Sequence, residues 1–268
     1  MAQAKRVLIT GAYGLIGNTV YRKLLESPDA YDVYGLARRQ HPSDRLPGTE
    51  TCAVPDDRLF LANLTDFAAL QRAVQDMDVV VHMAANPNGE AEWESVLNDN
   101  IIGAYNVFEA SRQAGVKRVV SASSMQVIHG YSLDEPYASL MEGDFTRFAP
   151  DGFARLTTTQ PTRPMNLYGA SKVWGEALAH VYAYAHGLSC ICLRIGWVLA
   201  EEPPPGFDAR VHWCSRRDVA QLVQRSIDAP DSLRFDVFFG LSDSDYSIAD
   251  IQHARDVLGY QPQDGVRG

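Results

Sequence analysis

A tyrosine and a lysine four positions apart, Tyr168 and Lys172, form the pair of residues in this sequence best suited to shared chemistry. The apolar spacing of residues 166–185 predicts a helix, and residues four apart on a helix share one face. An ammonium group beside a phenol stabilises the phenolate, which moves the tyrosine pKa from about 10 toward a value suited to proton transfer near neutral pH. Ser124, at the end of an expected strand, adds a hydroxyl. We predict that Ser124, Tyr168 and Lys172 are catalytic.

Three glycines with the spacing GxxGxxG, at Gly11, Gly14 and Gly17, mark a second candidate site. They lie between an apolar run at residues 5–10 and a helical pattern at 15–25, the order expected of a first strand, a turn and a first helix. Glycines in such a turn let backbone N–H groups approach a pyrophosphate at the helix N-terminus. The turn therefore predicts a bound dinucleotide, although its spacing differs from GxGxxG.

Two arginines, Arg38 and Arg39, follow the expected second strand at 32–37, where NAD-dependent enzymes usually carry an Asp or Glu for the adenosine ribose. Guanidinium groups bind phosphate through charge-assisted hydrogen bonds, and no carboxylate stands there in the sequence to repel a 2′-phosphate. We therefore predict NADP as the cofactor, with NAD as the alternative. Solvated loop charges are the other interpretation of the two arginines.

Apolar runs alternate with helical patterns through the first 195 residues, which predicts an α/β fold with a doubly wound, parallel Rossmann sheet. Residues 131–165, with Pro, Gly and Thr in their sequence, predict a long loop. We expect a Rossmann domain at 1–195, where the sheet ends, and a small, dependent substrate-binding lobe at 196–268. The expected strands of the sheet are 5–10, 32–37, 58–62, 78–82, 117–122 and 188–195, and the expected helices between them are 15–25, 66–75, 93–113 and 166–185. Beyond the sheet we expect a helix at about 217–228, a strand at 234–240 and a short helix near 248–257.

The composition argues against several classes of partner. A net charge of -9 leaves little attraction for nucleic acid or for an anionic membrane, and we expect neither a signal peptide nor a transmembrane segment. The four cysteines, Cys52, Cys190, Cys192 and Cys214, lack metal-ligand spacing, so we expect free thiols and no metal. These features predict a cytoplasmic protein that binds a small molecule.

The chain resembles the extended short-chain dehydrogenases/reductases, also called the NAD-dependent epimerase/dehydratase family, over about residues 5–260. The resemblance rests on segments 10–17, 61–64, 80–85, 100–103, 121–124, 168–172 and 194–196. It implies that Ser124 polarises a substrate carbonyl or hydroxyl, that Tyr168 is the acid/base, and that Lys172 binds the nicotinamide ribose. Asn63 stands where the family usually has Asp beside adenine, and it keeps an acceptor there. The cofactor contacts that follow are Gly11, Tyr13, Gly14, Leu15, Ile16, Gly17, Arg38, Arg39, Asn63, Leu64, Ala84, Ala85, Asn100, Ala122, Tyr168, Lys172 and Ile195.

Within the family the closest likeness is to small uronate and sugar dehydrogenases, which implies hydride transfer between a nicotinamide and a small sugar or sugar acid. Met125 and Gln126 stand where uronate dehydrogenases carry Asn and His, so the substrate contacts must differ. Arg210 is a candidate for binding a carboxylate, a surface position being its other interpretation, and His129 is a further pocket candidate. The predicted substrate contacts are Ser124, Met125, Gln126, Tyr168, Trp197 and Arg210.

Two alternatives to a sugar dehydrogenase stay open. The first is an enzyme that acts on nucleotide sugars, as an epimerase, a dehydratase or a reductase. The second is an NAD(P)-binding sensor without turnover. A short segment follows Lys172, which disfavours the nucleotide-sugar class because such enzymes generally carry a larger C-terminal lobe. The family resemblance also implies a homodimer formed through the helices at 93–113 and 166–185.

Overall fold

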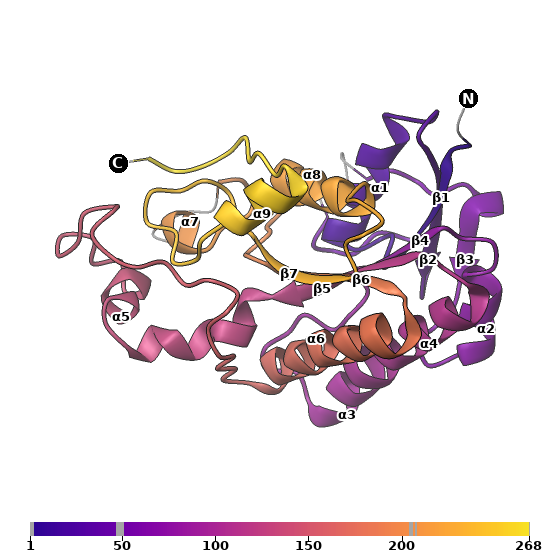
Figure 1. The fold of residues 1–268 in the computed structure, drawn as a ribbon, viewed down its shortest axis with the longest axis horizontal. Helices are drawn as coiled ribbons and strands as arrows, with labels where there is room; N and C mark the ends of the chain where they lie inside the picture. Colours follow the sequence, from indigo (N-terminus) through magenta and orange to yellow (C-terminus); the bar gives the residue numbers. More distant parts are fainter. Residues whose placement is uncertain (1–2, 47–50, 204–205, 207, 268) are drawn as a thin grey trace.

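A seven-stranded parallel sheet forms the centre of the computed structural model, which describes residues 3–46, 51–203, 206 and 208–267 (Figure 1). Its strand order is β3-β2-β1-β4-β5-β6-β7, and the reversal of direction beside β1 is that of a doubly wound fold. The α/β Rossmann class predicted from the sequence is confirmed. The strands span Lys5–Thr10 (β1), Tyr31–Ala37 (β2), Leu59–Leu61 (β3), Val79–His82 (β4), Arg118–Ser124 (β5), Ser189–Ile195 (β6) and Phe235–Gly240 (β7).

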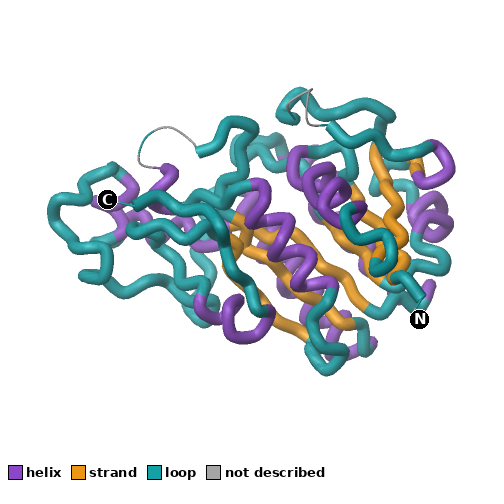
Figure 2. The backbone as a smooth tube through the Cα atoms, turned by 90° about the horizontal axis from the view of Figure 1, so that it is seen from above, coloured by secondary structure: helices purple, strands orange, loops and turns teal. Residues whose placement is uncertain are grey.

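Helices cover both faces of this sheet (Figures 1 and 2). One face carries α1 (Leu15–Leu25) packed against α8 (Arg216–Ile227), with α9 (Gln252–Leu258) beside α8. The other face carries α2 (Phe67–Ala73), α4 (Gly103–Ala114) and α6 (Leu167–His186), packed side by side. Successive strand residues point to opposite faces, so Ile9 and Val120 belong to the apolar cluster under α1 and α8, whereas Leu8 and Val119 belong to the other.

The helix expected over residues 93–113 is divided into three parts. It consists of α3 (Trp93–Ser95), a π-helix η3 (Val96–Ile102) and α4. The π-helical part carries Asp99 and Asn100, and π-helical turns occur frequently at functional sites. Apolar periodicity does not distinguish an α turn from a π turn over so short a stretch, so the sequence predicted only the overall span.

Two expectations from the sequence are wrong in detail. The sheet does not end with residues 188–195, because β7 pairs in parallel with β6 from Cys190 opposite Phe235 to Ile195 opposite Gly240. Residues 131–165 are not one continuous loop either, since they contain the end of a 3-10 helix η4 (Met125–Leu133) and all of α5 (Tyr137–Met141). The strand at 234–240 was expected, but a sequence pattern does not show which strands pair, and a helix as short as α5 depends on tertiary packing more than on its own pattern.

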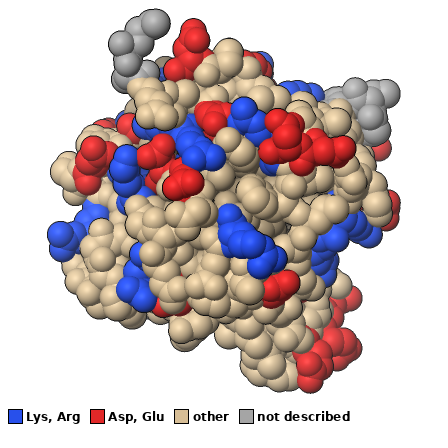
Figure 3. Space-filling model, turned by 90° about the vertical axis from the view of Figure 1, so that its right-hand side faces the viewer, with Lys and Arg blue, Asp and Glu red and all other residues tan. Residues whose placement is uncertain are grey.

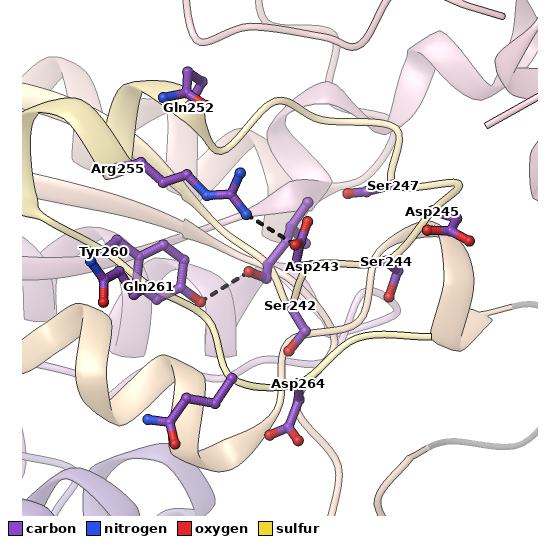
Figure 4. Close-up of polar contacts among 12 residues, drawn as sticks. Ser242, Asp243, Ser244, Asp245, Ser247, Gln252, Arg255, Tyr260, Gln261 and Asp264 are labelled. Atoms are coloured by element: carbon purple, nitrogen blue, oxygen red, sulfur yellow. Dashed lines mark hydrogen bonds and ion pairs between the residues drawn. The ribbon is translucent and has the colours of Figure 1, made fainter. Parts of the chain in front are cut away.

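The segment after α9 packs against the residues that follow β7 (Figure 4). Tyr260 is buried and donates a hydrogen bond from its hydroxyl to the Leu241 carbonyl oxygen (2.9 Å). Arg255 forms an ion pair with Asp243 (3.1 Å), and the Asp243 amide donates to the Asp264 carbonyl oxygen (2.8 Å). These contacts hold in place the segment after β7, and Ile248 in that segment lines the cavity described below.

Charged side chains of both signs lie next to one another on the side of the molecule shown in Figure 3. Exposed ion pairs such as Lys5–Asp228 (2.7 Å) and Lys117–Asp78 (2.8 Å) each contribute about 0.2–1 kcal/mol at most. The two apolar clusters therefore stabilise the fold far more than the surface charges do. In the part of the chain that the structure describes, no helix has the length and apolarity needed to cross a bilayer.

Candidate active site and cofactor cavity

A cavity of about 1150 Å³ runs along the carboxyl ends of the strands, where open α/β sheets bind their ligands. It reaches from the glycine-rich turn after β1 to the end of β5 and the first turn of α6. The structure thus brings the predicted phosphate turn and the predicted catalytic side chains to one cavity. Among the predicted site residues, its lining contains Gly11, Tyr13, Gly14, Leu15, Ile16, Gly17, Arg38, Arg39, Leu64, Ala84, Ala85, Ala122, Ser124, Met125, Gln126, Tyr168, Lys172, Ile195 and Trp197.

The glycine-rich turn offers both the space and the backbone donors that a pyrophosphate needs. Gly11 has a φ of +74°, and a Cβ on Gly17 would lie 2.1 Å from the Gly11 carbonyl oxygen, so both positions require glycine. α1 begins directly after Gly14, and no side chain caps its N-terminus. The first N–H groups of an α-helix have no partner within the helix and attract an anion. The turn therefore fits the pyrophosphate of a dinucleotide.

Ser124, Tyr168 and Lys172 meet beside the end of β5. Ser124 is the last residue of that strand, two residues beyond the range expected from the sequence, and its Oγ accepts a hydrogen bond from the Gln126 amide (3.1 Å). A hydrogen bond also joins the Ser124 and Tyr168 side chains. Lys172 Nζ donates to the Ala122 carbonyl oxygen (2.8 Å) and lies 5.6 Å from the centre of the Tyr168 ring. One face of α6 thus presents both the phenol and the ammonium group to β5.

Burial dominates the electrostatics of these groups. It raises the pKa of Tyr168 above 10, although the hydrogen bond with Ser124 and the positive charge of Arg45 act in the opposite direction. Burial also lowers the pKa of Lys172 from 10.5 to about 8. The expected lowering of the Tyr168 pKa is therefore not found, because the loss of solvent around the phenolate outweighs the attraction of nearby charges.

A buried ion pair fixes α6 against the sheet. Glu176, one turn after Lys172, accepts two hydrogen bonds of 2.8 Å from the Arg194 guanidinium group on β6. It also accepts one of 2.6 Å from the Ser123 hydroxyl on β5. The side chains of Glu176 and Arg194 are 10% and 4% exposed, so water competes little with these bonds. Glu176 was not predicted as a structural residue, because a single Glu in a helical pattern is typical of a solvated face.

Three predicted site residues lie outside the cavity lining. Asn63 Oδ1 accepts hydrogen bonds from the Thr65 amide (3.1 Å) and hydroxyl (3.2 Å), and so stabilises a local turn. Asn100 is buried, and its side chain bonds to both the amide and the carbonyl of Asn86 and to the Ser171 hydroxyl. Arg210 places its guanidinium group 5.1 Å from the centre of the Phe145 ring.

The end of the cavity near Trp197 contains two neutral imidazoles. His212 lies edge-on to Trp197, with 4.6 Å between the ring centres, and His129 lines the same wall. Burial lowers the pKa of His212 to about 4 and moves the pKa of His129 below 6.5, so both rings are uncharged at neutral pH.

Three residues of the lining were not predicted from the sequence: His212 and the charged residues Arg45 and Asp99. These residues belong to none of the motifs, and only tertiary packing brings them to the cavity. Among the described residues, no group of three or more His, Cys, Asp and Glu side chains is arranged to hold a metal ion.

The sequence profile of the NAD dependent epimerase/dehydratase family matches residues 7–230 of this chain. The chain belongs to this family, and the resemblance inferred from its motifs is confirmed. The two features that carry the assignment in the structure are the strand–turn–helix at Gly11–Gly17 and the meeting of Tyr168 and Lys172 with β5.

Two relatives from Haloferax volcanii are similar to almost the whole chain. An NAD-dependent glucose-6-phosphate dehydrogenase is 33% identical over 96% of this chain and 93% of its own length. An L-arabinose 1-dehydrogenase (NAD(P)(+)) is 34% identical over 97% of this chain and 96% of its own length. A crystal structure of a uronate dehydrogenase variant from Agrobacterium tumefaciens, complexed with NAD, has a TM-score of 0.76 at 30% identity and covers 98% of this chain and 86% of that one. The family and these similarities support an enzyme that uses NAD(H).

Removal of the Tyr168 hydroxyl tests the catalytic assignment. We expect Tyr168→Phe to lower kcat by about 10² or more, the scale of lost general acid–base catalysis, while cofactor affinity changes little. Nicotinamide absorbance on a substrate of the wild type measures kcat, and calorimetry measures cofactor affinity. Tyr137→Phe removes a hydroxyl from α5, outside the cavity lining, and should keep the wild-type kcat. A normal kcat in Tyr168→Phe would show that another group moves the proton.

Proposed function

We propose that this protein is an NAD(P)-dependent dehydrogenase that transfers a hydride between the nicotinamide and a small sugar or sugar acid. One observation carries the proposal: a serine, a tyrosine and a lysine lie together in the cavity that begins at the phosphate turn. A buried acid–base group of this kind is costly to maintain without a catalytic role. For this reason we favour an enzyme over a sensor without turnover.

The side chains of this chain account for the proton transfer. In the oxidative direction the Tyr168 phenolate takes the proton of a substrate hydroxyl, while the C–H bond on the same carbon breaks and its electron pair leaves as hydride. The bound nicotinamide supplies the hydride acceptor. Ser124 donates a hydrogen bond to the substrate oxygen, and Lys172 places a positive charge near the phenolate. In the reductive direction the Tyr168 hydroxyl returns the proton to the alkoxide oxygen.

The substrate end of the cavity suits a polar molecule with several hydroxyl groups. Gln126 lies next to Ser124, and its Oε1 accepts a hydrogen bond from Asn166 Nδ2 (3.1 Å), which orients the amide. Neutral imidazoles both donate and accept hydrogen bonds, as hydroxyls require. The C-terminal part, residues 196–268, supplies Trp197, His212 and Ile248 to the wall, and we assign to it the substrate-binding role. Arg210 reaches a substrate carboxylate only if its side chain leaves Phe145.

The similar proteins support a substrate without an attached nucleotide. Relatives with 30% identity or more over 96–98% of this chain include enzymes named for glucose-6-phosphate, L-arabinose and uronate, whereas a dTDP-glucose 4,6-dehydratase is 30% identical over 68% of the chain. A UDP-galactose 4-epimerase structure is similar at 21% identity, which is a likeness of fold alone. We therefore favour a substrate without a nucleotide, and the substrate screen described next includes nucleotide sugars to test the alternative.

A substrate screen tests this function directly. Aldoses, uronates, sugar phosphates and nucleotide sugars are offered with NAD and with NADP, and the change in nicotinamide absorbance is followed. We expect turnover with a free sugar, sugar acid or sugar phosphate. Turnover confined to a nucleotide sugar would replace the proposal with the epimerase or reductase alternative. Cofactor binding without turnover of any compound would replace it with the sensor.

We propose further that NADP binds more tightly than NAD, with its 2′-phosphate held by Arg38 and Arg39. Both arginines line the cavity directly after β2. A charge-assisted hydrogen bond to phosphate contributes about 1.5–3 kcal/mol, so Arg38→Ala should weaken NADP binding about 10- to 100-fold and NAD binding little. Arg72→Ala, on α2 and outside the cavity lining, is the matched control. Equal affinities of the wild type for both cofactors by calorimetry would contradict this preference.

The exposed side of α4 and α6 carries large apolar side chains that suit a homodimer. Tyr105, Trp174, Val181 and Tyr184 are each at least 40% exposed. We propose that these helices pair between two copies, and we expect light scattering to give twice the 29.6 kDa chain mass. Val181→Glu should then yield monomers, whereas Gln71→Glu on α2 should not. A wild type that is monomeric at micromolar concentration would exclude the dimer.

We place the protein in the cytoplasm. Cys52, Cys190, Cys192 and Cys214 are free thiols, and burial raises the pKa of Cys190 to about 12. Unpaired, unreactive thiols of this kind suit a reducing compartment.

A further inference from the structure

One carboxylate stands among the positive charges of the cofactor cavity. Among the described residues that line it, Arg38, Arg39, Arg45 and Lys172 are cationic, and Asp99 is the only Asp or Glu. Asp99 comes from η3, and both of its carboxylate oxygens lie 3.5 Å from Nη1 of Arg38. The carboxylate thus contacts the same guanidinium group that we propose for the 2′-phosphate.

The protein around Asp99 holds its carboxylate in place. The Asp99 side chain is 17% exposed, against 62% for Arg38, so Asp99 is the fixed partner of the pair. The Ser95 hydroxyl donates to Asp99 Oδ2 (3.4 Å) and accepts a hydrogen bond from Asn86 Nδ2 (2.7 Å). Asn100, the next residue, binds the backbone of Asn86 on both its amide (2.8 Å) and its carbonyl (3.1 Å). These bonds make Asp99 a built part of the cavity wall.

A carboxylate at this position affects the two cofactors differently. NADP differs from NAD by a 2′-phosphate, which carries about -1.5 to -2 charges near neutral pH. A phosphate bound to Arg38 has to share the guanidinium group with Asp99 and lie close to its negative charge, which weakens binding. NAD instead presents a ribose hydroxyl there, and a carboxylate accepts a hydrogen bond from a hydroxyl.

We propose that Asp99 is a cofactor-specificity residue, which limits the preference for NADP that Arg38 creates and retains NAD as a second cofactor. Asp99 supplies from η3 the negative charge that the end of β2 lacks. Its low exposure limits screening by salt, so its repulsion of a phosphate acts at physiological ionic strength. This inference rests on the proposed dinucleotide-dependent function.

The experiment compares Asp99→Asn with Glu94→Gln by calorimetric titration of NAD and NADP. Asp99→Asn removes the charge and keeps the size of the side chain, whereas Glu94→Gln removes the same charge from an exposed position on α3, outside the lining. In Asp99→Asn we expect the Kd of NADP to fall about fivefold to tenfold, while the Kd of NAD changes less than about threefold. Glu94→Gln should leave the ratio of the two Kd values within about twofold of the wild type.

The outcomes separate this inference from the function on which it rests. A wild type that binds both cofactors, with an unchanged ratio in Asp99→Asn, would overturn the role of Asp99 and leave the dehydrogenase proposal intact. A wild type that binds neither cofactor would overturn the dehydrogenase proposal itself. Near-ultraviolet circular dichroism checks that each variant is folded, and Asp99→Ser, which also removes the charge, replaces Asp99→Asn if the latter does not fold.

Discussion

The placement of α6 depends on the buried pair of Glu176 and Arg194. Two charges removed from water are unfavourable unless their hydrogen bonds are satisfied, and loss of one partner of such a pair typically costs about 3–5 kcal/mol. Here the carboxylate of Glu176 receives three hydrogen bonds, from Arg194 on β6 and from Ser123 on β5, while Nη1 of Arg194 is buried without a hydrogen-bond partner among the described residues. Those bonds form only when α6 lies at one height and one rotation on the sheet.

The position of α6 on the sheet also determines where the Tyr168 and Lys172 side chains lie relative to Ser124. Lys172 precedes Glu176 by one helical turn and Tyr168 precedes it by two, while Ser124 follows Ser123 on β5. The same bonds that lock Glu176 to the strands therefore set the distance between the phenol on α6 and the hydroxyl on β5. The Lys172 bond to the Ala122 carbonyl oxygen is a second tether between the same elements. The buried contacts beneath α6 thus keep in register the tyrosine that we propose as the acid–base group.

The distribution of charge explains how an acidic chain attracts an anionic cofactor. The whole chain has a net charge of -9, which opposes long-range binding of polyanions. Inside the cavity the described charges are those of Arg38, Arg39, Arg45 and Lys172 against the single carboxylate of Asp99. The low dielectric of the cavity walls strengthens these local charges relative to the distant acidic surface. The local charge therefore favours an anion in this cavity despite the acidic chain.

Features set by local sequence were predictable, and features set by tertiary packing were not. The glycine turn, the alternation of strands and helices, and the spacing of Tyr168 and Lys172 follow from backbone geometry within one or two elements. Asp99 and His212 have no local signal, because their position in the cavity depends on a π-helix and on the segment after β6. Asn100 matched a family motif, yet it bonds to Asn86 and Ser171 and lies outside the lining, a distinction that only side-chain packing reveals.

The π-helix connects these observations. Each residue of an α-helix adds a rotation of about 100°, so the extra residue of a π turn changes the direction in which all earlier side chains point relative to later ones. Ser95, before the π turns, meets Asn86 and Asp99, whereas Asn100, within them, meets Asn86 and Ser171. Ser95 and Asn100 both reach Asn86 although they are five positions apart, the spacing of i→i+5 bonding in a π-helix. The side chains of α3 and η3 thus join the carboxylate beside Arg38, the loop after β4 and the helix α6 in one hydrogen-bonded network.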